Sequence, residues 1–337
     1  MRIAIVSDAA PPQVNGVVRT LNCTTTELEK LGHAVRLIGP AEFATVPAPS
    51  YPEIRLALAP GWRLAKLIET FAPDAIHIAT EGPLGYAARK FCLRRGYPFT
   101  TAYHTRFPEY LEPRFGVPAA WTYSVLRRFH APARRIMVAT HSMEQELAAR
   151  GFTNLVRWSR GVDVDLFRPG PKDSYPWPRP ILLYVGRVAV EKNIEAFLNL
   201  DVPGTKVVIG DGPQRRSLEA RYPQARFLGK KSNGDLARHY AAADVFVFPS
   251  RTDTFGLVLL EAMAAGVPVA AYPVPGPLDV IGESGAGAMS DDLGAAVELA
   301  LRIDGAACRT RALGFSWEAS ARQFAAHVAP VVEAAVA

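Results

Sequence analysis

Two carboxylates eight residues apart mark the segment with the clearest chemical signature. Asp253 and Glu261 lie in SRTDTFGLVLLEAMAAGVPVAA, residues 250–271. The apolar run before this segment predicts a buried strand, and Thr254-Phe255-Gly256 predicts the turn that opens a helix. A helix start after a parallel strand suits a phosphate, because its backbone N–H groups are unpaired and its dipole is positive there. Glu261, further along the helix, is suited to accept hydrogen bonds from sugar hydroxyls.

An alternative without a ligand remains open for this segment. Asp is common near helix starts, where its side chain accepts hydrogen bonds from the first N–H groups. Asp253 would then cap an ordinary amphipathic helix, and Glu261 would face water.

Two cations follow the first predicted strand of the second half of the chain. Arg187 and Lys192 lie five residues apart in YVGRVAVEKN, residues 184–193. From a loop and the helix start after it, both side chains can converge on a diphosphate and stabilise the charge that develops as a nucleoside diphosphate leaves. The alternative is two solvated side chains near Glu191.

Two further residues follow predicted strands of the first half. Gly16, in PPQVNGVVRTL, lies where a glycine lets the backbone approach a ligand, although a glycine alone is more often an ordinary turn residue. His104 ends the strand predicted by YPFTTAYH, with Arg106 beside it. A lone histidine is usually a packing residue, but the end of a parallel strand is a ligand-binding position.

The predicted elements alternate between strands and helices throughout the chain. RIAIVSD, HAVRLIGP, DAIHIAT, YPFTTAYH and RIMVATH predict strands in the first half, and ILLYVGR, TKVVIGDG, ARFLG and DVFVFPS predict them in the second. Such alternation builds doubly wound parallel sheets, and 337 residues exceed what one core comfortably fills. We therefore expect an α/β protein with two Rossmann-like domains facing each other across a cleft, joined by the proline-rich segment 168–180.

Taken together, these segments resemble the retaining glycosyltransferases of family 4, which have the two-domain GT-B architecture. The carboxylate pair resembles the family signature, although members usually have Glu where this chain has Asp253. PPQVNGVVRTL, YHTRFPEY (103–110), YVGRVAVEKN and GDGP (210–213) resemble family elements in the expected order, so the likeness covers nearly the whole chain. PQVNGVVRTL and SRTDTF most resemble the subgroup of mannosyltransferases and glycolipid or sulfolipid synthases.

The resemblance implies which residues act in catalysis. Asp253 would bind hydroxyls of the donor sugar, and His104 would stabilise the transferred glycosyl group as positive charge builds at its anomeric carbon. Arg187 and Lys192 would neutralise the leaving diphosphate. No separate base is required, because the departing β-phosphate takes the acceptor proton on the same face.

The resemblance also implies a donor-binding set. Glu261 would bind the nucleotide ribose, which argues against a glycosidase-like pair of acid and nucleophile. The other members would act mainly through their backbone, on the diphosphate or on the base: Gly16, Thr254, Phe255 and Gly256 for phosphate, and Gly229 and Lys230 for the base.

Each domain has a role under this resemblance. The domain at residues 1–168 would bind the acceptor, and a final helix within residues 316–337 would cross back onto it, since that helix has an apolar face that needs a partner. The domain at residues 169–315 would bind the nucleotide sugar.

The net charge of +6 is unevenly distributed. Residues 1–170 contain 21 Lys and Arg against 14 Asp and Glu, whereas residues 171–337 contain 17 against 18. Because the donor's phosphates belong to the second half, the basic excess indicates an anionic membrane surface or an acidic acceptor. Nucleic acid is excluded, since no reader motif accompanies the charge.

Basic and aromatic residues concentrate in two segments that suit docking on anionic lipid, although both also suit a solvated helix face. The first is AAWTYSVLRRFHAPARRIM, with Trp121, Arg127, Arg128, Arg134 and Arg135; the second contains Arg89, Lys90, Arg94 and Arg95. No run of eighteen apolar residues is present, and MRIAIVSD lacks the layout of a signal peptide. We expect a cytoplasmic protein, peripheral on the cytoplasmic face of the membrane.

Neither a cofactor nor a metal is expected. Cys23, Cys92 and Cys308 form no Cys-x-x-Cys or Cys/His spacing. Asp163-Val164-Asp165 matches the Asp-x-Asp pattern of a magnesium-binding motif. Such a motif is expected only in the other major glycosyltransferase architecture, and in this chain the segment resembles the interdomain connection of family 4.

We expect a retaining glycosyltransferase that moves a hexose or hexuronic acid from a UDP- or GDP-sugar to a lipid or lipid-linked acceptor. One alternative is a soluble glycosyltransferase acting on a sugar, polysaccharide or small molecule. A non-catalytic sugar-nucleotide-binding protein is another, although it would be expected to lose some of Arg187, Lys192, Asp253 and Glu261. An epimerase of similar architecture is disfavoured by residues 250–271.

Overall fold

The computed structural model describes residues 1–13, 15–48 and 51–331 of the chain. It divides into two compact units, one formed by Met1–Arg160 with the segment from Trp317, the other by Gly161–Ser316. The chain leaves the first unit before the expected boundary at 168, because the residues after Arg160 bind the second unit. Val162 N donates to Phe315 O (3.1 Å), and Arg309 Nη1 donates to Phe167 O (2.8 Å).

The first unit is built on a sheet of six parallel strands. Its order is β2-β1-β5-β6-β7-β8, so the direction of strand addition reverses between β1 and β5. The strands are β1 (Arg2–Val6), β2 (Ala34–Ile38), β5 (Ala75–Ile78), β6 (Thr100–Tyr103), β7 (Arg135–Val138) and β8 (Leu155–Arg157). A separate antiparallel pair joins β3 (Thr45–Ala48) to β4 (Tyr51–Ala57). Since the six strands are parallel, all their carboxyl ends lie along one edge of the sheet.

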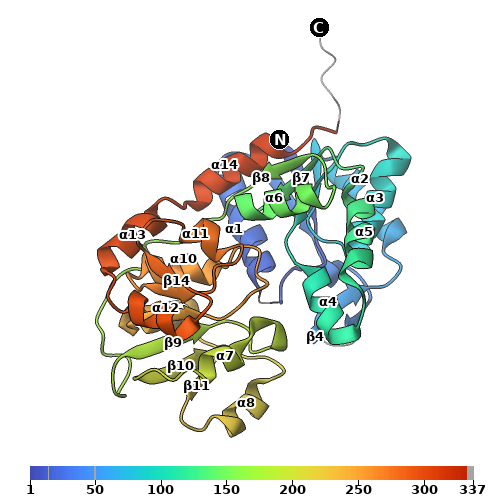
Figure 1. The fold of residues 1–337 in the computed structure, drawn as a ribbon. Coiled ribbons are helices and arrows are strands. Elements are labelled where there is room, and N and C mark those ends of the chain that lie inside the picture. Colours follow the sequence, from blue (N-terminus) through green and yellow to red (C-terminus); the bar gives the residue numbers. More distant parts are fainter. Residues whose placement is uncertain (14, 49–50, 332–337) are drawn as a thin grey trace. The chain divides into compact units, whose positions relative to one another are not determined.

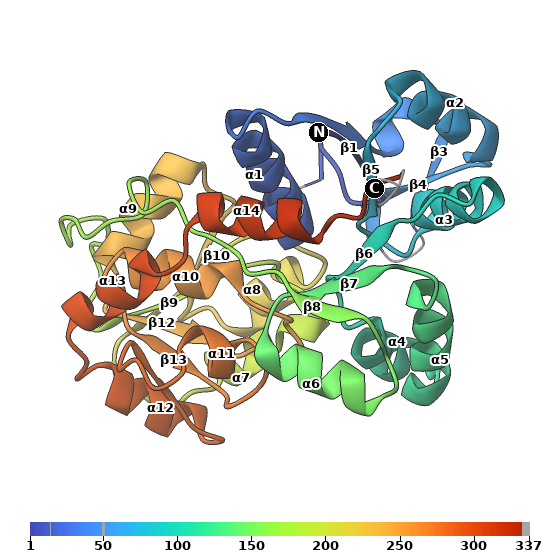
Figure 2. The same ribbon diagram turned by 90° about the horizontal axis from the view of Figure 1, so that it is seen from above.

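Helices cover both faces of this sheet. Leu21 and Leu28 of α1 (Gly16–Lys30) and Phe324 of α14 (Trp317–His327) share one core with Ile3 and Ile5 of β1. Both views show α14 beside α1 (Figures 1 and 2). The other face is covered by α2 (Gly61–Phe71), α3 (Pro83–Arg95), α5 (Ala119–His130) and α6 (His141–Ala149), and α4 (Phe107–Phe115) packs against α5.

The sequence explains these two layers locally. Because both faces of the sheet are covered, Ile3, Ala4, Ile5 and Val6 of β1 are all fully buried, and the strand is apolar without alternation. On α2, Leu64 and Ile68 are four residues apart and face the core, whereas Trp62 is 77% exposed.

The second unit repeats this plan with its own six-stranded parallel sheet. The order β11-β10-β9-β12-β13-β14 reverses between β9 and β12. The strands are β9 (Ile181–Val185), β10 (Thr205–Ile209), β11 (Arg226–Gly229), β12 (Val245–Phe248), β13 (Val269–Ala271) and β14 (Gly287–Met289).

The helices of the second unit also form two layers. One layer, with α7 (Ile194–Leu198), α8 (Arg215–Arg221) and α12 (Leu293–Ala300), shares a core with Leu182, Val208 and Val245 of the sheet. The remaining helices include α9 (Asn233–Ala242) and α13 (Gly305–Leu313), which pack on α10 (Leu257–Ala264), and α11 (Pro277–Val280). Single 3-10 turns occur at Pro40–Glu42 and Val190–Lys192. The predicted α/β fold with two Rossmann-like, parallel-sheet domains is confirmed.

Candidate functional site

The candidate donor residues of the second unit lie at the carboxyl edge of its sheet. Arg187 and Lys192 follow β9, Gly229 ends β11 and Asp253 follows β12. Strands β9 and β12 are hydrogen-bonded neighbours at the point where the strand order reverses. In open α/β sheets a ligand binds at this topological switch point.

An ion pair joins the two loops at the switch point. Lys192 Nζ lies 2.5 Å from Asp253 Oδ1, and both side chains are about one-fifth exposed. Two further hydrogen bonds connect the same loops, because Thr252 Oγ1 donates to Glu191 O (3.2 Å) and Asn193 Nδ2 donates to Pro249 O (3.1 Å). The structure therefore brings together a cation and a carboxylate that are far apart in the sequence.

Helix α10 begins just after the predicted turn. Its N-cap is Gly256, which has the left-handed φ of +84° that favours glycine. No side chain among the described residues caps this helix, so the alternative in which Asp253 is a helix cap is wrong. The alternative in which Glu261 faces water is also wrong, since this residue is only 3% exposed.

The residues around the start of α10 offer mainly their backbone. Phe255 is buried, and its ring packs edge-on against Phe315 at a centroid distance of 6.2 Å. At the end of β11, which is separated from β12 by β10 and β9, Gly229 has a φ of +68° and Lys230 is exposed. Tyr184 Oη donates to Arg187 O (2.8 Å) and fixes the loop after β9.

The candidate residues of the first unit lie at the carboxyl edge of the first sheet. His104 directly follows β6, and its Nδ1 lies 3.3 Å from Arg160 Nη2. Burial, then Arg160, and then His77 and His130 hold the pKa of His104 well below its usual value, so its imidazole is neutral. Gly16 is the first residue of α1, and a Cβ there would meet no atom within 4 Å. The fold of this unit therefore does not itself require a glycine at position 16.

Comparisons with known sequences identify the family of this chain. The family model described as Glycosyltransferase Family 4 matches residues 14–166, and the model described as Glycosyl transferases group 1 matches residues 179–303. A GDP-mannose-dependent alpha-mannosyltransferase of Mycobacterium tuberculosis is 32% identical over 310 residues, which cover 83% of this chain and 81% of the relative. The chain belongs to glycosyltransferase family 4.

Two more distant similarities extend the comparison. An alpha-monoglucosyldiacylglycerol synthase of Streptococcus pneumoniae is 25% identical over 82% of this chain and 72% of its own length. The solved structure of a sucrose-phosphate synthase from Thermosynechococcus elongatus superposes with a TM-score of 0.76, at 22% identity, over 96% of this chain and 97% of that one. This family 4 glycosyltransferase therefore has the predicted GT-B fold and is an enzyme.

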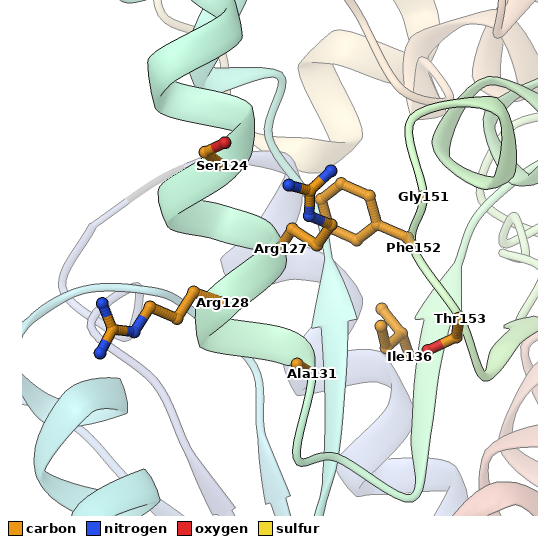
Figure 3. Close-up of a pocket in the computed structure, with 8 residues that line it drawn as sticks. All are labelled: Ser124, Arg127, Arg128, Ala131, Ile136, Gly151, Phe152 and Thr153. Carbon is orange, nitrogen blue, oxygen red and sulfur yellow. The ribbon is translucent and has the colours of Figure 1, made fainter.

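A pocket of about 420 Å³ lies elsewhere on the first unit of the glycosyltransferase, between α5, β7 and the turn after α6. Arg127 and Phe152 line it and lie side by side in Figure 3, whereas Arg128 points away from them. The pocket includes Ile136, near the amino end of β7, so it lies at the edge of the sheet opposite to His104. We therefore do not place the active site in this pocket.

Two of the five residues predicted to face a membrane also bind backbone carbonyls of the first unit. Arg127 Nη1 donates to Arg150 O (3.0 Å), and Arg135 Nη1 donates to the carbonyls of Ala326 (2.9 Å) and His327 (3.0 Å) at the end of α14. These two arginines hold the unit together. All five are exposed, Trp121 at 63%: Trp121, Arg127, Arg128, Arg134 and Arg135.

The side chain of Asp163 of the glycosyltransferase stabilises the turn in which this residue lies. Its Oδ1 accepts hydrogen bonds from Asp165 N (3.1 Å) and Leu166 N (2.9 Å). In the described part of the chain, no three His, Cys, Asp or Glu side chains are arranged to hold a metal ion.

Three residues at the carboxyl edge of the first sheet have contacts that the sequence did not predict. Arg160 contacts His104, as described above. Arg106 Nη2 donates to both Glu109 (3.0 Å) and Glu146 (2.9 Å), just after His104 in the chain. Asp8 is buried at the reversal between β1 and β5, where its carboxylate accepts from Thr80 Oγ1 (2.9 Å) and Leu84 N (2.9 Å). Only the fold places these partners together, since most are separated by forty or more residues.

Within the described residues, no helix combines the length and the apolar character needed to cross a bilayer.

Proposed function

We propose that this enzyme transfers a hexose or hexuronic acid from a UDP- or GDP-sugar to a lipid or lipid-linked acceptor, with retention of the anomeric configuration. The observation that supports this most strongly is the Lys192–Asp253 pair at the switch point of the second unit, beside the start of α10. A cation, a carboxylate and the backbone N–H groups of a helix start are the groups that a nucleoside diphosphate sugar requires.

Each donor-binding residue has a proposed partner. Lys192 and Arg187 neutralise the diphosphate, and the N–H groups of Thr254, Phe255 and Gly256 bind its distal phosphate. Asp253 accepts hydrogen bonds from sugar hydroxyls. Further residues assist on the nucleotide side: Glu261 at the ribose, Gly229 and Lys230 at the base, and Gly16 where the backbone approaches the diphosphate.

In the proposed mechanism, the enzyme positions the donor and stabilises charge. The bond between the anomeric carbon and the β-phosphate oxygen breaks, and negative charge grows on that phosphate, where Lys192 and Arg187 oppose it. The same phosphate takes the proton of the acceptor hydroxyl, which attacks from the side that the phosphate leaves. His104 stabilises the glycosyl group as positive charge builds at its anomeric carbon.

A lipid acceptor is supported by a relative and by a surface. The relative is the alpha-monoglucosyldiacylglycerol synthase, whose name states its lipid product. The surface, which we call the basic surface, is the outer side of α2, α3 and α5. These helices lie along one side of the first unit in both views (Figures 1 and 2). We define the basic surface by seven exposed residues of these helices: Trp62, Arg63, Lys66, Lys90, Arg94, Trp121 and Arg128.

Contacts within the first unit hold these helices in place. Arg89 Nε donates to Phe129 O (2.9 Å) and thereby ties α3 to α5, and Arg95 pairs with Glu69, which ties α3 to α2. Exposed indole rings next to lysine and arginine suit the headgroup region of an anionic membrane. We therefore propose that the enzyme is peripheral on the cytoplasmic face of such a membrane, with the basic surface against the lipid.

The donor is tested by incubating the purified enzyme with UDP-, GDP- and ADP-sugars and measuring release of the nucleoside diphosphate. We expect release from sugars of one base, UDP or GDP, and its loss in the Lys192→Ala variant. The proposal would be contradicted if no donor released its nucleoside diphosphate and calorimetry detected no binding of any nucleoside diphosphate. That result would favour a protein that does not use nucleotide sugars.

A further inference from the structure

Arg160 is held rigidly at the carboxyl edge of the first sheet. It is only 3% exposed, its Nη1 donates to Trp158 O (2.5 Å) and Ser159 O (3.0 Å), and its guanidinium carbon lies 4.1 Å from the centre of the Trp158 ring. Trp158 is itself fully buried, and its Nε1 donates to Ser320 Oγ (3.1 Å). These contacts fix the direction in which the other end of the guanidinium points.

No acid among the described residues balances the charge of Arg160. Burial lowers the pKa of Arg160 to about 9, and no carboxylate of the described residues offsets this effect. The side chain remains a cation at neutral pH, because even the lowered pKa lies above 7. A buried cation of this kind is costly, and such groups cluster at functional sites.

The contact with His104 determines where the imidazole proton lies. Arg160 Nη2 is 3.3 Å from His104 Nδ1, and a guanidinium can only donate. Nδ1 must therefore be the acceptor, which leaves the single proton of the neutral ring on Nε2. The titratable groups that face His104 are Arg160 from the segment after β8, His77 from β5 and His130 from α5, and none of them is acidic.

We propose that Arg160 is a positioning residue that holds His104 as the neutral Nε2–H tautomer, so that its imidazole acts as a fixed hydrogen-bond donor and never as an acid or a base. This inference rests on the proposed role of His104 beside the reacting sugar. Positive charge builds at the anomeric carbon in the transition state, and a protonated imidazole next to it would oppose that charge. Burial and the cation of Arg160 together oppose such protonation, and the fixed direction of the guanidinium selects the tautomer.

Nitrogen NMR of the full-length enzyme, labelled with ¹⁵N-histidine and free of substrate, tests the geometry. The His104 signals are assigned with His104→Gln, and spectra are recorded between pH 5 and pH 8. We expect an unprotonated Nδ1, a protonated Nε2 and no titration of His104 in the wild type. In Arg160→Met the pKa of His104 should rise and its signals should titrate within this range, whereas Arg160→Lys should retain the neutral ring.

Transfer activity at several pH values supplies the functional test. In Arg160→Met, kcat should fall about tenfold per pH unit below the new pKa of His104, as expected for one ionisation, and Arg160→Lys should lack this acid limb. A wild-type His104 that is protonated on Nδ1, or that titrates near its usual pKa, would overturn the inference even if Arg160→Met does not fold. Because the NMR measurement needs no donor or acceptor, its result is independent of whether the proposed reaction is correct.

Discussion

Lys192 and Asp253 form an ion pair with 2.5 Å between Nζ and Oδ1, across the boundary between β9 and β12. Both side chains remain partly exposed, so the pair is accessible to a ligand at the edge of the sheet. A donor diphosphate would offer Lys192 a second anion, and a sugar hydroxyl would offer Asp253 a donor. In the proposed mechanism, the pair would hold both groups in position before the donor arrives.

Removal of the cations should depress the chemical step. We expect Lys192→Ala and Arg187→Ala each to lower kcat by about 10²- to 10³-fold, because charge on the leaving phosphate peaks in the transition state. Steady-state kinetics with saturating donor measures this effect. Arg216→Ala, which removes an exposed cation of α8 in the same unit, is the matched control and should leave kcat unchanged. Full activity of either test variant would rule out its proposed role.

Glu261→Gln should weaken donor binding more than it slows the reaction. Loss of one charge-assisted hydrogen bond costs about 1.5–3 kcal/mol, so KM for the donor should rise about 10- to 100-fold while kcat changes little. Glu298→Gln, on the exposed side of α12, provides the same chemical change away from the site. An unaltered donor KM in Glu261→Gln would show that this carboxylate does not bind the ribose.

The basic surface should determine binding to lipid. We expect the wild type to sediment with vesicles that contain anionic lipid and to detach as salt rises, since each engaged Lys or Arg contributes about 1 kcal/mol near such a surface. Lys90→Glu, Arg94→Glu and Arg128→Glu together should abolish sedimentation. Donor hydrolysis should persist, because these side chains lie on the outer helices of the first unit.

A charge-matched variant distinguishes lipid binding through the basic surface from lipid binding that depends only on the net charge of the protein. Reversal of Arg216, Arg226 and Arg302, three exposed cations of the second unit, changes the total charge by the same amount. Sedimentation of this control should match that of the wild type. Equal loss in both triple variants would contradict docking through the basic surface, and wild-type binding that ignores lipid charge would favour a soluble acceptor.

Acid should destabilise the first unit through a buried histidine. Burial, and then Arg160, lower the pKa of His77 from 6.5 to about 3. In the unfolded chain this residue takes up a proton near pH 6.5, whereas the folded protein does not. Its contribution to the free energy of unfolding is therefore complete above pH 6.5 and is lost at about 1.4 kcal/mol per pH unit as the pH falls towards 3.

Urea unfolding at pH 7.5, 6.0 and 5.0 measures this dependence. We expect His77→Gln to be less stable than the wild type at pH 7.5, because the ring contacts with Trp158 and Phe324 are lost. Its stability should nevertheless fall less steeply with acid. Identical slopes for the two proteins would show that His77 is not the group responsible.

The elements of the fold were predictable because their signals are local. The buried strands are continuous apolar runs, and the start of α10 was predicted from the strand-turn-helix pattern around Gly256. The Lys192–Asp253 contact was not predictable, since it joins residues 61 positions apart and depends on β12 pairing with β9. A strand order of this kind follows from the packing of the whole unit and not from any short segment.

The same limit explains why the contacts of Arg135 could not be predicted. Arg135 was expected to face lipid because it follows a basic and aromatic helix in the sequence. In the structure it binds the last carbonyls of α14, which lie about 190 residues later. Arg160 was missed for a related reason, because its partner His104 lies 56 residues earlier and the segment SRGVD has no recognisable chemical pattern.

The most direct test of the proposed reaction is transfer of a labelled sugar to lipid. The purified enzyme is incubated with the donor selected by the hydrolysis screen and a total lipid extract, and the labelled product is isolated and analysed by NMR. We expect label in the organic phase, in a glycoside whose anomeric configuration matches that of the donor, and none with the Lys192→Ala variant. Inversion of the anomeric centre, or label confined to water-soluble products, would contradict the proposal that this enzyme is a retaining glycosyltransferase with a lipid acceptor.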